Sequence, residues 1–440
     1  MREGVINEYE RTPGTAECLG RNRGHFKTGI MMKKIICTIF TVGAFAFAAL
    51  SQVSDVTALQ SIQVDVVYLS SDVLEGRETG TQGEELAARY ISSRFREIGL
   101  QPGGEAGTYF QPFVFRHVPQ PQSEGEVRTG KNVIGYLDNG ASKTVVIGAH
   151  YDHIGYGAFN SRYVGDPAIH NGADDNASGV AALLWLAEHF SGGVAESNNY
   201  LFIAFSAEEM GLHGSKHYVG DAADGIDKIN YMINLDMVGR LGDDQVLTIN
   251  GAGTSPIWAD VIERVKVAGI QSVVATESGI GPSDHTSFYL KDVPSLHFFT
   301  GVHEDYHKPS DDSHLVNYEG LLAVSQYVSA LIEGLDEQGS VEFSKTKDEQ
   351  PQRAARYKVT LGVMPDYAFS GPGMRVEAVL DGRPAQKAGI EDGDVILKIG
   401  ETTVKDIYGY MDALGKYGEG QKAEVVVKRK DQQLTKEVVF

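Results

Sequence analysis

The segment Thr144–His153 reads TVVIGAHYDH: a short apolar run that ends directly in two histidines and an aspartate. Further apolar runs of strand length alternate with longer runs of helical length. In chain order these are Val180–Phe190, Tyr200–Phe205, Tyr231–Leu235, Ile257–Val267, Ser295–Phe299 and Leu321–Leu335. Alternation of strands and helices at these lengths predicts an α/β fold, with a mainly parallel mixed sheet covered by helices on both faces.

Upstream of this region, the apolar residues of Glu84–Ile98 recur at helical spacing, and Gly99 is placed to end the helix. A stretch rich in Pro and Gln follows, with Pro112, Pro119 and Pro121, and we interpret it as a loop.

The carboxyl ends of parallel strands are where α/β sheets bind their ligands. The residues that follow the apolar runs, or precede the helix Val180–Phe190, are His150 and Asp152, Asp174 and Asp175, Glu208 and Glu209, Asp236, and His307 with Asp311. Two histidines and three carboxylates, one of them shared, are the ligand count for a pair of divalent ions that flank one water and one substrate oxygen. Imidazole and carboxylate ligands without thiolate favour zinc, with cobalt or manganese as substitutes.

Five motifs in this order resemble those of the M28 family of zinc exopeptidases, whose best-known members are aminopeptidases. They are HYD at 150–152, GADDNASG at 172–179, AEE at 207–209, NLD at 234–236 and YHKP at 306–309, with LEGR at 74–77 upstream. The resemblance covers roughly residues 60–335. It implies that His150 and Asp236 bind one zinc ion, Glu209 and His307 the other, and that Asp174 bridges the two. It also implies that Glu208 is the general base and that a cis peptide joins Asp174 and Asp175.

Several nearby polar residues are predicted to line the site or support its ligands. Asp152, two residues after His150, suits a partner that holds the imidazole, and Asp175, His285 and Asp311 are assigned to the surroundings of the site. His213 and His217 are spaced four apart, as in a zinc-binding helix, but the Glu of HExxH is missing, and we interpret them as a solvated helix face. Ser283-Asp284-His285 contains the residue types of a triad. Without a GxSxG elbow it does not indicate a serine hydrolase.

The C-terminal part differs in composition and motifs from the region before it. Residues 337–354 are polar and read as a linker, and residues 355–440 resemble a PDZ domain of the exported-protease type through TLGV at 360–363, GRPAQKAGI at 382–390 and GDVILKIG at 393–400. The resemblance implies that Leu361, Gly362 and Val363 form the loop that binds a peptide C-terminus. A helix is expected over Asp406–Leu414. The alternative is an added packing domain with an empty groove.

The N-terminal part and the composition bear on location. Lys33 and Lys34 precede an uncharged run, Ile35–Leu50, which is short for a bilayer span and typical of a signal peptide. We therefore expect residues 1–51 to be an upstream extension and signal peptide, with a periplasmic or extracellular mature protein and no stable membrane anchor; an uncleaved anchor is the alternative.

The two cysteines, Cys18 and Cys37, exclude a disulfide framework. The chain has 59 acidic and 39 basic residues, and the resulting net charge of −20 disfavours nucleic acid as a partner.

The sequence thus predicts an exported zinc peptidase, with residues 52–336 as the peptidase domain. The function implied is that of an aminopeptidase that removes N-terminal residues from peptides with a metal-activated water, Glu208 being the base. The alternatives are a glutaminyl cyclase-like transferase of the same fold, a carboxypeptidase-type relative, and a binding protein with an inactive site. The preferred terminal residue, the ligand of the PDZ domain and the oligomeric state are not predicted.

Overall fold

A computed structural model describes residues 55–117, 125–221, 225–346, 359–365, 372–379, 382–405, 407–430 and 432–440. The predicted signal peptide, Pro119 and Pro121, and residues 347–354 of the predicted linker lie outside these ranges. Within the described residues, no helix combines the length and the apolar character needed to cross a membrane. The elements group around separate hydrophobic cores, one formed between Ile62 and Leu335 and another between Leu361 and Val438.

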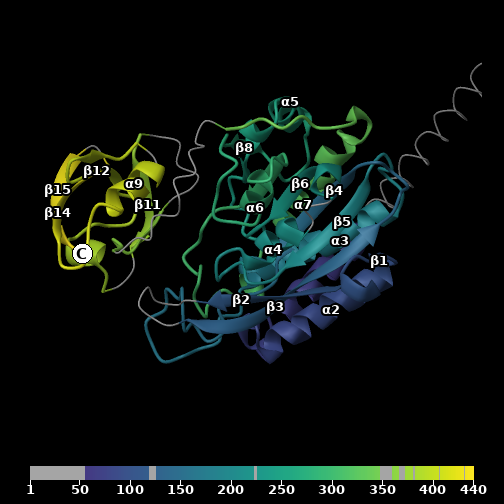
Figure 1. Cartoon of the computed structure of the whole chain (residues 1–440), viewed down its shortest axis with the longest axis horizontal. Coiled ribbons are helices and arrows are strands. Elements are labelled where there is room, and N and C mark those ends of the chain that lie inside the picture. Colours follow the sequence, from purple (N-terminus) through teal and green to yellow (C-terminus); the bar gives the residue numbers. More distant parts are fainter. Residues whose placement is uncertain are drawn as a thin grey trace, which may run out of the picture. The chain divides into compact units, whose positions relative to one another are not determined.

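The first group is built on a nine-stranded mixed sheet (Figure 1). Its strands are β1 (Gln101–Pro102), β2 (Phe110–His117), β3 (Glu126–Leu137), β4 (Thr144–His150), β5 (Asn199–Phe205), β6 (Ile229–Leu235), β7 (Val246–Asn250), β8 (Ser272–Ala275) and β9 (Ser295–Phe299). Their order is β1-β3-β5-β4-β6-β9-β7-β8, with β2 paired to β3. The central strands β5, β4, β6 and β9 are parallel to one another, while β3 and β7 join them in antiparallel fashion. The predicted α/β fold is therefore confirmed.

Helices cover both faces of this sheet, as predicted. The helices are α2 (Gln82–Ile98), α3 (Gly179–Ser191), α4 (His213–Asp221), α5 (Trp258–Arg264), α6 (His285–Tyr289) and α7 (Tyr318–Glu333). Alternate residues of β4 face opposite sides: Val145 and Ile147 pack in the core that α2, α3, α5 and α7 share, whereas Val146 packs in a smaller core with residues of α4 and α6. Helix α3 lies between α2 and α7 and buries most of its surface, so it is apolar on nearly all sides.

The register of the parallel strands brings their carboxyl ends to one edge. His150 at the end of β4 pairs with Phe205 at the end of β5, and Leu235 at the end of β6 pairs with Phe298 of β9. The loops that follow these three strands and β9 therefore start side by side, which positions the polar residues that the sequence places after each strand.

One predicted loop is a strand. Pro112 lies in β2, which pairs with β3 over Phe110–His117 and forms an edge of the sheet. Proline has no N–H to donate, and an edge strand tolerates it because its outer side needs no partner. Alternating burial along β2 places Phe113 and Phe115 on the covered side.

The second group is a six-stranded antiparallel sheet with two short helices. Its elements are β10 (Val363–Pro365), β11 (Met374–Val379), α8 (Pro384–Lys387), β12 (Val395–Ile399), β13 (Thr402–Thr403), α9 (Ile407–Leu414), β14 (Lys422–Arg429) and β15 (Gln432–Val439). Residues Ile407–Leu414 of the helix predicted over Asp406–Leu414 form α9, and Asp406 lies outside the described residues. The predicted carboxylate loop, Leu361–Val363, leads into the edge strand β10, and its Gly362 has a positive φ of 71° with Arg383 packed against its Cα.

Part of the predicted linker is packed on the first group. The Val341 N–H donates to Asn230 Oδ1 at 2.8 Å, and the Ser344 N–H donates to the Thr254 carbonyl at 2.8 Å. The Thr346 N–H donates to the buried Tyr289 hydroxyl at 3.1 Å. The segment 341–346 therefore belongs structurally to the first group.

Candidate active site

The site lies at the carboxyl edge of the parallel strands, where six His and carboxylate side chains converge. His150 is the last residue of β4, Asp236 follows β6, and Glu209 lies in the turn after β5. Asp175 comes from the π-helical turn η3 (Ala173–Ser178) before α3, and His307 from the segment after β9. The sixth residue, His153, is fully buried three residues beyond His150.

Asp175 lies between two subsets of these side chains. His150 Nε2 is 3.3 Å from Asp175 Oδ1 and 3.3 Å from Asp236 Oδ1. On the other side, His307 Nε2 is 3.1 Å from Asp175 Oδ2 and 3.3 Å from Glu209 Oε1. Two groups of potential metal ligands result, His150–Asp175–Asp236 and His153–Asp175–Glu209, each with ligand atoms within 4.8 Å of one another. One carboxylate is shared, an arrangement that suits a pair of ions.

The sequence predicted that Asp174 is the carboxylate shared by the two groups of ligands, but in the structure Asp175 has this position. Asp174 faces away from the imidazoles of His150 and His307: its Oδ1 accepts the Gly239 N–H at 2.6 Å, and its Oδ2 is 3.2 Å from His303 Nε2. These partners orient Asp174 toward the segment after β6, so its neighbour Asp175 takes the shared position. The cis peptide also falls one residue later than expected, between Asp175 and Asn176.

The loop that carries Asp175 is held by two anchors. The Asp311 carboxylate accepts the Asp174 N–H at 3.0 Å and the Asp175 N–H at 3.1 Å, a supporting position of the kind predicted for Asp311. Gly172 at the start of the loop has a positive φ of 56°, and a Cβ there would lie 2.1 Å from the Asp175 carbonyl oxygen. Only glycine fits this close approach, and the fit fixes where the loop turns toward the site.

Arg77, the last residue of the LEGR motif, was given no role from the sequence and is a structural anchor. Its buried guanidinium donates to the carbonyls of Tyr151 at 2.8 Å and Asn171 at 2.7 Å, and also to those of Leu69 and Gly172. It therefore ties the segment after β4 to the loop that carries Asp175. Burial lowers the Arg77 pKa to about 10, while the charges of Asp175 and Asp152 act to raise it.

Asp152 supports the site in a different way from the one predicted. His150 Nδ1 lies 3.2 Å from the main-chain carbonyl of Asp152 and 3.9 Å from its carboxylate Oδ1, so the carbonyl is the nearer partner of the imidazole. The carboxylate accepts the Glu208 N–H and the Thr79 hydroxyl, both at 3.1 Å. Asp152 thus positions both His150 and Glu208.

His285 is buried beside the site and not among the converging ligands. Its ring stacks on His297 with 4.7 Å between centroids, and burial followed by the charge of His297 lowers the His285 pKa well below its usual value. Its neighbour Asp284 acts electrostatically on Glu208.

The electrostatics of the converging side chains fit cations. Burial lowers the pKa of His150 and of His307, but neighbouring carboxylates outweigh it, and both pKa values are raised well above the usual range. Burial raises the pKa of Asp175 and Glu209, but the nearby imidazoles outweigh it; the pKa of Asp175 is well below its usual value, and that of Glu209 is lowered to about 2. The polypeptide alone therefore holds protons on imidazoles that face ionised carboxylates, and divalent ions would take the place of those protons.

Two further observations fit metal binding. His153 Nδ1 is 2.8 Å from Glu209 Oε1, while its Nε2 is buried without a hydrogen-bond partner in the described structure. His153 was not among the predicted ligands; the spacing of His150 and His153 by three residues was the available signal. His307 has a φ of 53°, a left-handed conformation that costs an L-residue about 1–2 kcal/mol and is typical of functional sites.

Glu208 directly precedes Glu209 in the turn after β5. Burial raises its pKa well above the usual value, and Asp236 and Asp284 add to this effect against the attraction of His150. The residue before it, Ala207, is fully buried with a φ of 56°, so the turn that aims Glu208 is strained. A carboxylate with a raised pKa is a stronger base than an ordinary one, which suits a residue that accepts and returns a proton.

Two protein families match this chain, one in the region of each of the two hydrophobic cores. Residues 132–332 match the model of peptidase family M28, and residues 341–439 match that of the PDZ domain. Residues 132–332 belong to peptidase family M28. All six converging side chains, and Glu208, lie within this M28 region.

Known relatives of the M28 region include aminopeptidases. Aminopeptidase YwaD of Bacillus subtilis is 29% identical over 47% of this chain and 44% of its own length. The probable lipoprotein aminopeptidase LpqL of Mycobacterium tuberculosis is 29% identical over 54% of this chain and 46% of its own. The chain thus spans about half the length of these relatives.

Solved structures share the fold of the M28 region. BSAP, a zinc aminopeptidase from Bacillus subtilis, aligns with a TM-score of 0.52 at 19% identity, over 66% of this chain and 96% of that one. A glutaminyl cyclase from Bacteroides thetaiotaomicron aligns with a TM-score of 0.51 at 21% identity, over 62% of this chain and 97% of that one. At 19% and 21% identity, the similarity establishes the fold alone. An aminopeptidase and a glutaminyl cyclase share this fold, so the fold does not decide between the two activities.

Proposed function

We propose that this chain is a zinc-dependent aminopeptidase that binds two zinc ions and uses Glu208 as general base. The observation that carries the proposal is the position of Asp175, whose carboxylate is shared by two groups of ligand atoms, one with His150 and Asp236 and one with Glu209. His307 and His153 both face the second group, so five or six protein ligands are available for the two ions. Imidazole and carboxylate donors suit zinc, and cobalt or manganese could replace it.

The residues around the ions have separable roles in this proposal. Zinc ions bound here supply the Lewis acidity that lets a water attack a peptide carbonyl at neutral pH. Glu208 accepts the proton of that water and later donates it to the amine that leaves. Asp152 holds the main chain of Glu208 and, through its own carbonyl, the ring of His150.

The aminopeptidase assignment rests on the M28 region and on the aminopeptidases among its relatives, and four peptides test it. The zinc-loaded protein should remove the first residue from a peptide with two free ends and from the same peptide with an amidated C-terminus. The N-acetylated version should stay intact. Cleavage that is blocked by C-terminal amidation would indicate a carboxypeptidase, and loss of ammonia from a peptide that begins with glutamine, without cleavage, would indicate a cyclase.

For the second group of elements we propose binding of a peptide C-terminus. The loop Leu361–Val363 enters the edge strand β10, where an added strand would find unpaired main-chain groups. A peptide with a free C-terminal carboxylate should bind the full chain, and its C-terminally amidated form should bind at least tenfold more weakly. Equal binding of the two forms would contradict this role.

Export to the periplasm or outside the cell is also a proposal. It rests on the basic and apolar pattern of Lys33–Leu50 and on the absence of cysteine after Cys37. N-terminal sequencing of the protein from a producing cell should find a start near Gln52, and a start that retains Cys37 would contradict it.

A further inference from the structure

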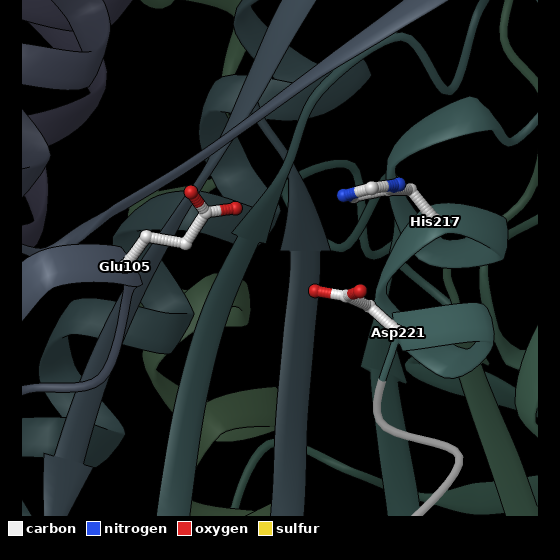
Figure 2. Close-up of side chains that lie close together, drawn as sticks. All are labelled: Glu105, His217 and Asp221. Carbon is white, nitrogen blue, oxygen red and sulfur yellow. The ribbon is translucent and has the colours of Figure 1, made fainter.

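A second convergence of metal-ligating side chains lies apart from the active site. Glu105, His217 and Asp221 each offer a ligand atom, and these atoms lie within 4.8 Å of one another. Figure 2 shows the imidazole and the two carboxylates pointing toward a common space. In the described part of the chain, the two other groups of this kind are those that share Asp175.

The fold brings these three residues together from two distant segments. His217 and Asp221 are spaced four apart on α4 and therefore share one face of that helix. Glu105 begins the short turn η2 (Glu105–Gly107) that precedes β2. This placement revises the interpretation of His213 and His217 as a solvated helix face.

Both histidines of α4 are held by stacking on β2. The ring of His217 stacks on Phe113 with 5.2 Å between centroids, and that of His213 stacks on Phe115 with 4.3 Å. The two rings thus have the same kind of support, but among the described residues only His217 belongs to a group of potential metal ligands. In the described structure, His217 Nε2 is shielded from solvent and has no hydrogen-bond partner, an arrangement that is costly unless something binds there.

The carboxylates are not neutralised by protein cations. Among the described residues, neither Glu105 nor Asp221 forms an ion pair with a Lys or Arg, and no hydrogen bond joins the three side chains to one another. The Asp221 carboxylate accepts one hydrogen bond, from Gln111 Nε2 at 3.4 Å, through Oδ2. Its other oxygen and the Glu105 carboxylate remain available to a ligand.

We propose that Glu105, His217 and Asp221 form a binding site for a divalent transition-metal ion of the zinc class, distinct from the active site. One imidazole nitrogen and two carboxylate oxygens are ligands that zinc accepts, with a water in the fourth position. Calcium requires six to eight oxygen ligands, and magnesium keeps most of its waters, so neither matches a set that includes imidazole. A zinc ion lies about 2.0–2.2 Å from each ligand atom, so binding would draw the three side chains closer together.

A bound ion would link η2 to α4, which follows the turn that carries Glu208 and Glu209. A hydrogen-bond path already connects them: Gln111 Oε1 accepts from Asn132 Nδ2 at 2.9 Å, and Asn132 Oδ1 accepts the Ser206 N–H at 3.2 Å. Ser206 begins the segment that leads to Glu208. The ion is therefore expected to stabilise this part of the chain, without direct contact with the reacting groups.

Zinc content at a fixed free zinc concentration tests the site. The full chain, Glu105→Gln, His217→Phe and the matched control His213→Phe are dialysed to equilibrium against zinc and then analysed for bound metal. Glu105→Gln and His217→Phe should each hold one zinc equivalent fewer than the unchanged chain, whereas His213→Phe should hold the same number. Phenylalanine at position 217 keeps the stack on Phe113, and Glu105 is exposed, so Glu105→Gln carries the test if His217→Phe folds poorly.

The comparison counts a difference in bound zinc and is independent of how many ions the active site holds or whether the protein is a peptidase. Equal zinc content in all four proteins would overturn the proposal, as would a loss in His213→Phe equal to that in His217→Phe. Added zinc should also raise the melting temperature of the unchanged chain more than that of Glu105→Gln. An equal rise in both would count against the site.

Discussion

Two buried groups of charged side chains in this chain differ in how their charge is balanced. In the second group of elements, Asp394 is fully buried, and its two oxygens accept from Arg429 at 2.7 and 2.8 Å, with a third bond from the Glu391 N–H at 3.0 Å. At the edge of the large sheet, the nearest cationic partners of Asp175, Glu209 and Asp236 among the described residues are imidazoles, and His153 Nε2 has no hydrogen-bond partner there.

The difference separates a structural role from a binding role. Asp394 has one guanidinium matched to its geometry, and such a pair is complete without any ligand. The three carboxylates of the sheet edge exceed the fixed positive charge around them, and a buried excess of negative charge is stable only with a cation or with protons. The following predictions test this contrast, beginning with the largest effect.

Asp175→Asn should abolish most activity. The change removes the charge shared by the two groups of ligands, so zinc affinity should fall at both positions and turnover should drop at least about a thousandfold, or about 4 kcal/mol in the barrier. Asp174→Asn is the matched control, since Asp174 is equally buried but faces Gly239 and His303. It should keep its zinc and lose less than about tenfold. A larger loss of zinc and activity in Asp174→Asn than in Asp175→Asn, with both variants folded by circular dichroism, would mean that Asp174 is the bridging residue.

Substitutions of Glu208 and Glu209 should affect different functions, proton transfer for Glu208 and metal binding for Glu209. Glu208→Gln removes the proton acceptor and should lower turnover by about a hundredfold or more at unchanged zinc content. Glu209→Gln removes a charged ligand; it should lose zinc at one position and regain part of its activity at high zinc concentration by mass action. Kinetics and metal analysis on both variants decide this. Zinc loss in Glu208→Gln with full zinc in Glu209→Gln would mean that the roles are exchanged.

The sequence predicted the fold and most of the site because periodicity and strand ends carry that information. The apolar runs at Thr144–Gly148 and Tyr231–Leu235 are strands, and His150 and Asp236 follow from their ends. The bridge could not be placed within GADDNASG, because two adjacent aspartates differ only in which main-chain groups they meet, here Gly239 N–H for Asp174. Nor could the site formed by Glu105 with α4 be found, since it depends on packing between segments far apart in the chain.

Asp394→Asn should affect stability and not activity. Burial raises the pKa of Asp394, but hydrogen bonding to Arg429 outweighs it, and the pKa is below its usual value. The variant should lose about 1–2 kcal/mol, less than a fully buried pair would, because the Arg429 side chain is 26% exposed and solvent screens it. Glu437→Gln is the control: it breaks the exposed pair with Lys422 and should change stability by less than about 0.5 kcal/mol.

The effect of Asp394→Asn should depend on pH in a defined direction. Because the folded pKa is below the unfolded value of about 3.9, the stabilisation is complete above about pH 5 and is lost progressively as the pH falls through the folded pKa. Both tryptophans, Trp185 and Trp258, lie in the first group of elements, so hydrogen exchange of peptides from β12 and β14 is the suitable measurement. An equal destabilisation by Asp394→Asn at neutral and strongly acidic pH would contradict the role of the ion pair.

The packing of residues 341–346 has a consequence for separating the two folding units. The Tyr289 hydroxyl is buried and meets Thr346 through the N–H at 3.1 Å and the side-chain hydroxyl at 2.9 Å. A chain cut near Asp336 would leave this hydroxyl and the Asn230 side chain without those partners, at a cost of about 1–3 kcal/mol for each buried polar group. We therefore expect a separately expressed first group to need the chain as far as Thr346. Early melting of a version cut near Asp336 would then reflect the lost contacts of residues 341–346, and would not show a dependence on the second group.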